Sequence, residues 1–320
     1  MPRARSERMP IRERAAEELN PKMGRMGAED PSIRRGGDLD LSIRPVRPAD
    51  RERILEMTRD VWDGHDYIPR VFDDWVSDAS AAFQAVEVEG VVVGVQRMRP
   101  YAEGLVWYEG LRVATSHRRQ GIARSMLESA IAEAREQGLR EMRLATGNAD
   151  AVPLFEAAGF RRLVDVRWWK AGRVEGGDPA RIPDPKEAGR LWSAVASSAG
   201  LDLYRGVAAD FNGARDLGEA ELARLAGAGM LRVATGGRAV AGLRAAWGDN
   251  LAIAFIAGRG AALRDLLLAL RYEADADGLD HVTVSVPRGH PAGDDLNASG
   301  YDLANAEDSA YIYGLELNQP

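Results

Sequence analysis

The sequence contains no cysteine, and this absence excludes several chemistries at once. Without a thiol, the chain forms no disulfide, no thiolate metal site and no cysteine nucleophile. Histidine is also scarce, and the four residues are dispersed without the spacing of a helical zinc motif: His65, His117, His281 and His290. We therefore expect no bound metal.

Long apolar runs are absent as well. No stretch of about 18 apolar residues occurs, so we expect no transmembrane helix. The N-terminal segment also lacks the apolar core of a secretory signal. The net charge is −7, so the chain has no overall attraction to nucleic acid or anionic membranes. These absences predict a cytoplasmic protein that binds neither nucleic acid nor membrane.

A chain of 320 residues is long for one hydrophobic core and sufficient for two domains. Residues 1–40 mix Arg, Glu, Pro and Gly with little apolar periodicity, which predicts a disordered tail or a short helix around Ile11–Leu19. The alternative, a nucleic-acid-binding arm, is disfavoured because acidic and basic residues nearly balance there. Residues 172–184 are rich in Gly, Pro and charge and are typical of a linker. The expected domains are therefore 41–171 and 185–320.

The apolar pattern of the first domain predicts the order strand, two helices, three antiparallel strands, helix, strand, helix and strand. The expected elements are a strand at 41–46, helices from Pro48 and over 68–76, strands at 83–88, 91–98 and 105–113, a helix at 122–137, a strand at 141–146, a helix at 151–158 and a strand at 160–170.

The second half repeats this order less regularly. Residues 230–244 resemble a hairpin, 250–257 and 281–287 resemble strands, and 261–276 resembles a helix that ends before Gly278. We expect a degenerate copy of the first domain.

The segment Glu109–Arg124 combines a strand end, a basic loop and the first turn of a helix. Gly121 and Ala123 are small residues at the expected helix start, where a ligand can approach free backbone N–H groups closely. Such a helix start binds anions. Three arginines of the same loop add positive charge: Arg118, Arg119 and Arg124. The pattern predicts a pyrophosphate-bearing ligand, and the alternative is a solvated basic turn that caps the helix.

Two motifs in the first half resemble those of the GNAT acyltransferase superfamily. The family's acetyl-CoA loop has the form [Q/R]-x-x-G-x-[G/A], which Arg118, Gly121 and Ala123 match. Its second motif, an Asn, a short helix with an aromatic residue and then Gly-Phe, is matched by Asn148, Phe155, Gly159 and Phe160. The resemblance covers residues 41–170. It implies an α/β (α+β) fold with a mixed, mostly antiparallel sheet flanked by helices, here in two tandem copies.

The resemblance implies acetyl-CoA as co-substrate. The loop would bind the pyrophosphate, and the strand at 111–113 would pair its backbone with the pantetheine arm. The residues expected to contact acetyl-CoA are Leu111, Arg112, Val113, Arg118, Arg119, Gln120, Gly121, Ile122, Ala123, Arg124, Asn148 and Phe155. For Asn148, a helix cap or turn residue is an equal alternative.

Glu109 is the expected catalytic base. An amine attacks only when neutral, so a base must remove its proton near pH 7. Many relatives have a Glu at this position, and period two places it on the face of Trp107 and Leu111. The alternative is a salt bridge to Arg97 or Arg112. Phe155 departs from the family, because many relatives have there a Tyr that protonates the leaving thiolate; Tyr67, Tyr101 and Tyr108 could replace it.

The acceptor pocket is expected between the two early helices, as the resemblance implies. Asp66 could bind an ammonium group and Arg70 a carboxylate, with Tyr67 beside them. Tyr101 and Trp107 could wall the pocket. The alternatives are a polar loop for the first three residues and core positions for the last two.

These expectations together predict an N-acetyltransferase that acts on a primary amine of a small molecule or amino acid. The phrases Trp62–Arg70 and Glu109–Val113 also resemble a group of histidine or amino-acid N-acetyltransferases. The alternatives are a protein N-terminal or lysine acetyltransferase and an acyl-CoA-binding regulator without turnover. The second half is expected to bind CoA poorly and to serve as scaffold, pocket wall or homodimer contact.

Overall fold

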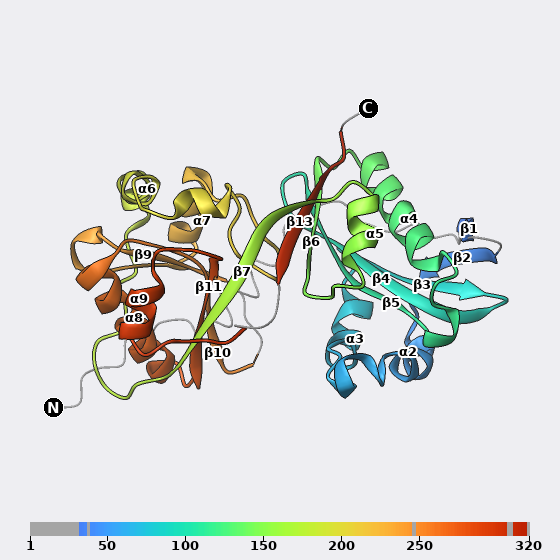
Figure 1. The fold of residues 1–320 in the computed structure, drawn as a ribbon, viewed down its shortest axis with the longest axis horizontal. Helices are drawn as coiled ribbons and strands as arrows, with labels where there is room; N and C mark the ends of the chain where they lie inside the picture. Colours follow the sequence, from blue (N-terminus) through green and yellow to red (C-terminus); the bar gives the residue numbers. More distant parts are fainter. Residues whose placement is uncertain (1–31, 37–38, 245–247, 306–309, 319–320) are drawn as a thin grey trace. The chain divides into compact units, whose positions relative to one another are not determined.

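A computed structural model describes residues 32–36, 39–244, 248–305 and 310–318. Residues 1–31, which hold most of the expected disordered tail and its alternative, the short helix around Ile11–Leu19, lie outside the described residues. The chain divides into two compact units (Figure 1). The N-terminal unit ends at Arg161 and also takes in the chain from Tyr313, whereas the C-terminal unit comprises Arg162–Ile312.

The elements of the N-terminal unit are β1 (Ser32–Gly36), β2 (Leu39–Pro45), α2 (Arg51–Thr58), α3 (Ile68–Ser77), β3 (Ala82–Val88), β4 (Val91–Ala102), β5 (Leu105–Val113), α4 (Ile122–Glu136), β6 (Glu141–Thr146), α5 (Val152–Ala157) and β13 (Tyr311–Glu316), with short 3₁₀ helices at Pro48–Asp50, Val61–Gly64 and Thr115–His117. From β2 to α5 the unit has the expected order of elements, but its last strand is β13 and not the strand expected at 160–170. The sheet order is β1-β2-β3-β4-β5-β6-β13. Neighbours from β1 to β5 are antiparallel, and β5 and β6 are parallel. The expected mixed, mostly antiparallel sheet flanked by helices is therefore confirmed.

Two apolar clusters cover the two faces of this sheet. Helices α2 and α3 bury Ile54 and Phe72 against Phe83 and Val95 on one face. On the other face Met126 and its α4 neighbours pack on β2, β3 and β4. Each fully buried side chain of this kind contributes about 1.5–3 kcal/mol, so the clusters fix the helices on the sheet.

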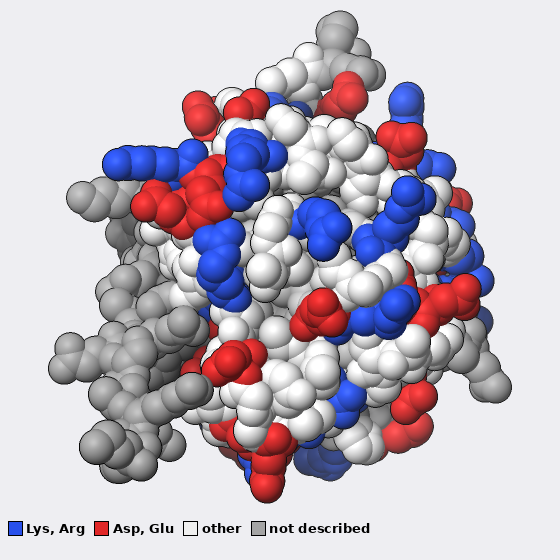
Figure 2. All heavy atoms as spheres, turned by 90° about the vertical axis from the view of Figure 1, so that its left-hand side faces the viewer, with Lys and Arg blue, Asp and Glu red and all other residues white. Residues whose placement is uncertain are grey.

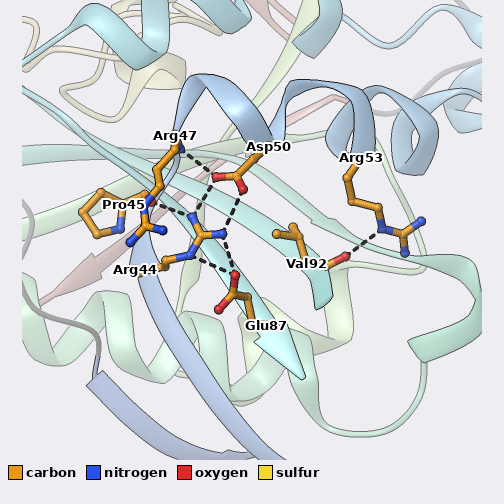
Figure 3. A network of polar contacts seen from close by, with 7 residues as sticks. All are labelled: Arg44, Pro45, Arg47, Asp50, Arg53, Glu87 and Val92. Atoms are coloured by element: carbon orange, nitrogen blue, oxygen red, sulfur yellow. Dashed lines mark hydrogen bonds and ion pairs between the residues drawn. The ribbon is translucent and has the colours of Figure 1, made fainter. Parts of the chain in front are cut away.

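A buried arginine ties the end of β2 to the first helical turn (Figure 3). The Arg44 guanidinium donates to both oxygens of Asp50, at 2.7 and 2.8 Å, and through Nε to Glu87 Oε1 on β3 at 2.9 Å. Asp50 Oδ2 also accepts the backbone N–H of Arg47 at 2.7 Å. The pKa of Arg44 is raised by its hydrogen bonds to these two carboxylates, so the pair remains ionised and holds this corner together.

The C-terminal unit has a similar order of elements around its own strands. They are β7 (Arg161–Gly172), α6 (Ala188–Ala196), α7 (Glu219–Gly227), β8 (Leu231–Val233), β9 (Val240–Arg244), β10 (Asn250–Ala257), α8 (Gly260–Ala276), β11 (His281–Pro287), α9 (Gly293–Ala298) and β12 (Asp302–Leu303), with 3₁₀ helices at Pro185–Glu187, Leu201–Tyr204 and Thr235–Gly237. Strands β8, β9 and β10 are antiparallel, and β10 and β11 are parallel across α8. Both units thus place a parallel crossover helix after three antiparallel strands.

The division into units differs from the expected ranges 41–171, 172–184 and 185–320. Strand β7 pairs with β11 from Val166 to Gly172, which places it with the C-terminal unit. The strand next to β6 is β13, and not the strand expected at 160–170. Strand β1 also forms within the range expected to be disordered, because it pairs with β2 over its whole length. Periodicity predicts a strand but does not identify its partner, which explains these differences.

Candidate functional site

Strands β5 and β6 separate part-way along their length. They are paired only from Leu105 to Trp107 on β5 and from Glu141 to Arg143 on β6. Strand β5 continues to Val113 and β6 continues to Thr146 without further pairing between them. The second half of β5 therefore presents backbone groups to the space between the strands, where an extended ligand arm could pair with them.

A β-bulge lies on β5 at the same level. Glu109 pairs with Arg97, but Arg112 pairs with Val95, so two residues of β5 face one residue of β4. Gly110 adopts φ +70°, and a Cβ at this position would lie 2.8 Å from the Trp75 ring. The bulge breaks strict alternation, so the expected alignment of Glu109 with Leu111 by period two does not hold.

The predicted anion loop lies at the start of α4. Arg119 has φ +61°, and Gly121, the residue before α4, has φ +83°; neither value is common for L side chains. No side chain caps the helix at Gly121. Helix α4 has 15 residues, so its uncapped first N–H groups carry the partial positive charge of the helix dipole. The arrangement suits an anion.

The side chains of this loop divide into anchored and free ones. Arg118 Nε donates to the Val113 carbonyl at 3.3 Å, and Gln120 donates to the Ser116 carbonyl at 3.2 Å. Arg119 and Arg124 are exposed and have no ion pair among the described residues. Ile122 is buried and anchors the helix start in the core. Two exposed cations thus flank the backbone at the start of α4, with Ala123 half-buried beside it.

Asn148 and Phe155 lie beyond the end of β6. Asn148 is exposed, and its Oδ1 accepts the backbone N–H of Asp150 at 3.0 Å, which is the turn role that the sequence left open. Phe155 is buried, with its ring centroid 6.4 Å from that of Tyr108. The Tyr108 hydroxyl donates to Gln96 at 3.0 Å. Tyr108 is therefore engaged in the core and is poorly placed to replace the missing tyrosine hydroxyl.

Glu109 is the residue of the site with the closest ionic partners. Its Oε1 accepts a hydrogen bond from Arg97 and lies 3.5 Å from Arg99 Nε. The alternative salt bridge to Arg97 is thus present, whereas Arg112 binds elsewhere. Glu109 is still partly exposed, and its Oε2 has no hydrogen bond among the described residues.

Asp66, expected to bind an ammonium group, is already paired. Arg112 donates to both of its oxygens, at 2.7 and 3.2 Å, and the Ile68 backbone N–H donates to Oδ1 at 3.0 Å. The Asp66 side chain is 1% exposed. The structure therefore assigns Asp66 to an internal ion pair at the start of α3. Arg70 is exposed on the first turn of that helix.

Two aromatic rings cover the Arg112 guanidinium. Its carbon lies 4.6 Å from the Trp62 ring centroid and 5.4 Å from that of Tyr67. Burial and the charge of Glu109 raise the pKa of Tyr67 to about 12, so its phenol is neutral at pH 7. Trp62 has φ +50° and is 53% exposed. The sequence placed Trp62 in the phrase Trp62–Arg70 but not among the site residues, because its exposure and left-handed backbone appear only in the structure.

Tyr101 and Trp107 lie in the core of the N-terminal unit. Their rings meet edge to face with centroids 5.9 Å apart, and each residue is less than 5% exposed. The structure does not bring them to an accessible pocket wall. Leu111 and Val113, in contrast, are half-buried where β5 leaves β6.

The C-terminal unit has a cavity of about 580 Å³ at the start of α8. Its lining includes Ser198, Arg238 and Arg259. However, the Gly260 N–H at this helix start donates to Asp295 Oδ2 at 2.7 Å, and Arg264 pairs with the same carboxylate at 2.6 Å. At the start of α8 the Asp295 carboxylate thus accepts a backbone N–H, whereas no described side chain caps the start of α4.

A charged surface, a metal site and a membrane-spanning helix are further features that would indicate a function. On the face that carries α6, α8 and α9, basic and acidic side chains are interspersed, without a continuous area of one sign (Figure 2). Within the described residues, no group of three or more His, Asp or Glu could hold a metal ion. Every helix in that part of the chain is too short or too polar to span a bilayer.

Comparison with known proteins finds a family match in the N-terminal unit, which contains the loop at the start of α4. The acetyltransferase (GNAT) family matches residues 51–160, from α2 to just beyond α5. The aminoglycoside N(6′)-acetyltransferase type 1 of Klebsiella aerogenes is 29% identical over 143 residues, which are 40% of this chain and 94% of that protein. A histidine N-acetyltransferase of Oreochromis niloticus is 29% identical over 88 residues, 27% of this chain, and the chain spans only 26% of its length.

Solved structures are similar over most of this chain. A GCN5-related N-acetyltransferase from Sphaerobacter thermophilus covers 88% of this chain and 96% of its own, with a TM-score of 0.56 and 13% identity. At this identity the likeness concerns the fold.

Proposed function

We propose that the chain is an acetyl-CoA-dependent N-acetyltransferase, because residues 51–160 match the acetyltransferase (GNAT) family. Its acceptor is a primary amine of a small molecule or amino acid. The observation that carries this proposal is the uncapped, arginine-flanked start of α4 directly after the strand that leaves β6.

The described residues fit acetyl-CoA in two places. The backbone at Gly121 and Ile122, with Arg119 and Arg124 beside it, would hold the pyrophosphate. The exposed edge of Leu111–Val113 would pair with the extended pantetheine arm. Bound in this way, acetyl-CoA would supply the thioester that donates the acetyl group.

The chemistry is a direct transfer. The neutral amine forms a C–N bond to the acetyl carbon, the C–S bond breaks, and the electron pair leaves with sulfur. The second proton that the nitrogen loses on becoming an amide passes through water to the departing sulfur. Glu109 Oε2, which has no hydrogen bond among the described residues, accepts the proton of the acceptor ammonium, directly or through water. Positioning both reactants at the separated strands provides most of the rate gain.

The departing thiolate requires no tyrosine. Phe155 carries no proton, and the Tyr108 hydroxyl is bound to Gln96. A thiol has a pKa near about 8.5, so the thiolate leaves readily and takes its proton from water.

The acceptor binds against an aromatic surface and Glu109. The Asp66–Arg112 pair would hold Trp62 and Tyr67 in place instead of binding the ammonium group itself. The aminoglycoside and histidine N-acetyltransferases among the relatives support a small-molecule amine as substrate.

The test is release of free CoA thiol from acetyl-CoA in the presence of amino acids, polyamines, aminoglycosides and peptides. We expect turnover with at least one small amine. Thiol release with peptides alone would instead assign a protein acetyltransferase.

Gly121→Glu provides the matched test of the binding site. A carboxylate and a Cβ at φ +83° would oppose the pyrophosphate, so acetyl-CoA affinity should fall at least about 100-fold by calorimetry. Gly138→Glu is the control, because Gly138 follows the other end of α4 with φ +71° and open space around it. Equal affinities of the two variants would refute the loop assignment.

A second function, acyl-CoA binding without turnover, is favoured by Phe155 alone. It predicts calorimetric binding of acetyl-CoA with no thiol release for any amine of the panel.

A further inference from the structure

Arg97 is a buried cation between two carboxylates of different elements. Its Nη1 donates to Glu109 on β5, and its Nη2 donates to Asp78, the residue that ends α3. The guanidinium carbon lies 4.7 Å from the Trp75 ring centroid, and Arg97 is 4% exposed. Its Nε has no hydrogen-bond partner among the described residues. The two hydrogen bonds and the Trp75 ring together restrict the movement of this guanidinium.

The Asp78 end of this pair is fully anchored. Asp78 Oδ1 accepts the Ser80 N–H at 3.0 Å and the Ser80 hydroxyl at 2.6 Å, so Oδ2 is left for Arg97. Burial acts to raise the pKa of Asp78, but the hydrogen bonds from Ser80 and the charge of Arg97 outweigh it and lower the pKa. Asp78 is therefore a fixed negative support for Arg97.

The Glu109 end is only half engaged. Oε1 faces Arg97 and Arg99, both from β4, and Oε2 has no hydrogen bond within the described part of the chain. The other ionisable groups around this end are Tyr67 and the Asp66–Arg112 pair. In the series Ser80–Asp78–Arg97–Glu109, both oxygens of Asp78 thus accept hydrogen bonds, whereas Glu109 pairs with other described residues only through Oε1.

We propose that Arg97 is a positioning residue that holds Glu109 Oε1 and thereby fixes Oε2 for the acceptor amine, with Asp78 as its support. The inference rests on the proposed function, because Glu109 must be the base for its placement to affect the rate. Gly110 takes part through packing, since the absence of a Cβ lets Trp75 lie close to the strand under Arg97.

The test is a double-mutant cycle of Arg97→Gln and Glu109→Gln, read as kcat and as the KM for acetyl-CoA. Alone, Arg97→Gln should lower kcat about 10–100-fold and change that KM less than about twofold, because a base out of place costs part of a general-base effect. In the Glu109→Gln background it should cost less than about twofold more, because residues that act as one unit are not additive.

Arg44→Gln is the matched control. Arg44 is also buried and also joins two carboxylates, Asp50 and Glu87, within the same unit. It should lower the melting temperature without lowering kcat of the folded enzyme. Arg97→Lys retains the charge with only one point of contact, so it should recover part of kcat and serves if Arg97→Gln does not fold.

The outcomes separate the two proposals. Turnover that falls in Glu109→Gln and stays normal in folded Arg97→Lys and Arg97→Gln, or losses that are fully additive, would overturn the positioning role and leave the transferase intact. Binding of acetyl-CoA without turnover in the natural protein would overturn both.

Discussion

Glu109 shows at the scale of one residue how a carboxylate can be both paired and available. Two guanidinium groups lie at Oε1, and no side chain of the described residues binds Oε2. From the sequence, a salt bridge and a catalytic base are alternative roles of Glu109, but the observed geometry is compatible with both roles. The distinction therefore depends on kinetics.

Glu109→Gln should lower kcat about 100-fold or more, because the amide cannot accept the ammonium proton. The acetyl-CoA dissociation constant should stay within about twofold, since the residue lies outside the pyrophosphate loop. Stopped-flow kinetics and calorimetry measure the two quantities. Glu103→Gln, an exposed turn residue between β4 and β5, is the control. A rate equal to that of this control would remove the base role.

Asp66 marks the limit of what residue types can predict. The sequence identified it as a charged group near the acceptor, and it does lie beside β5. Its partner, Arg112, is 46 positions away, so the sequence could not indicate that the charge is already neutralised. The exposed aromatic surface that results was equally invisible, because it depends on Arg112 supporting Trp62.

The β5 bulge is the feature that matters most at the scale of elements. It lies in the half of β5 that does not pair with β6, and Gly110 makes it possible by adopting φ +70° beside Trp75. Strand positions were predictable from alternation, as β5 at Leu105–Val113 and β6 at Glu141–Thr146 illustrate. The bulge was not, because it arises from register against β4.

Gly110→Ala should destabilise the protein and lower kcat together. The new methyl group would meet the Trp75 ring at 2.8 Å, which adds about 1–3 kcal/mol of overpacking to the cost of the left-handed backbone. Gly104→Ala has φ +68°, but its methyl group would meet only the flexible Arg140 side chain. It should show the backbone cost of about 1–2 kcal/mol alone. Urea unfolding measures both, and equal losses would contradict the role of Trp75.

The Arg44–Asp50 pair predicts a pH dependence of stability. Burial acts to raise the pKa of Asp50, but hydrogen bonds from Arg44 and Arg47 lower it below the ordinary value of 3.8. A carboxylate whose pKa is lowered in the folded state stabilises the protein at pH values above its unfolded-state pKa. This stabilisation is lost as the pH falls through the folded-state pKa. The melting temperature of Asp50→Asn should therefore lie below that of the natural protein at pH 7. The difference should shrink below about pH 4, and a difference that grows on acidification would contradict the pair.

At the scale of the whole molecule, the two units share an order of elements but differ where the anion would bind. Helix α4 begins without a capping side chain, whereas α8 begins with Asp295 on the Gly260 N–H. From the sequence we expect only that the second half binds CoA poorly. The capping carboxylate comes from α9, which follows α8 and β11.

Calorimetry should therefore find one acetyl-CoA per chain. The Asp295 carboxylate repels a pyrophosphate at α8, so the cavity beside it should stay without this ligand. Gly121→Glu should then abolish the single binding event, and Arg259→Gln should leave it unchanged. A second site of comparable affinity that survives Gly121→Glu would show that the C-terminal unit also binds.

The strand β13 has a consequence for the order in which the protein is made. The first unit contains the residues that match the acetyltransferase family, yet its sheet is completed by residues from Tyr313 onward. During translation at about 5–20 residues per second, the ribosome must first synthesise the whole second unit, which takes roughly 8–30 s. The nascent first unit waits through that interval with the edge of β6 uncovered, and it can acquire its final stability only when the second unit has emerged.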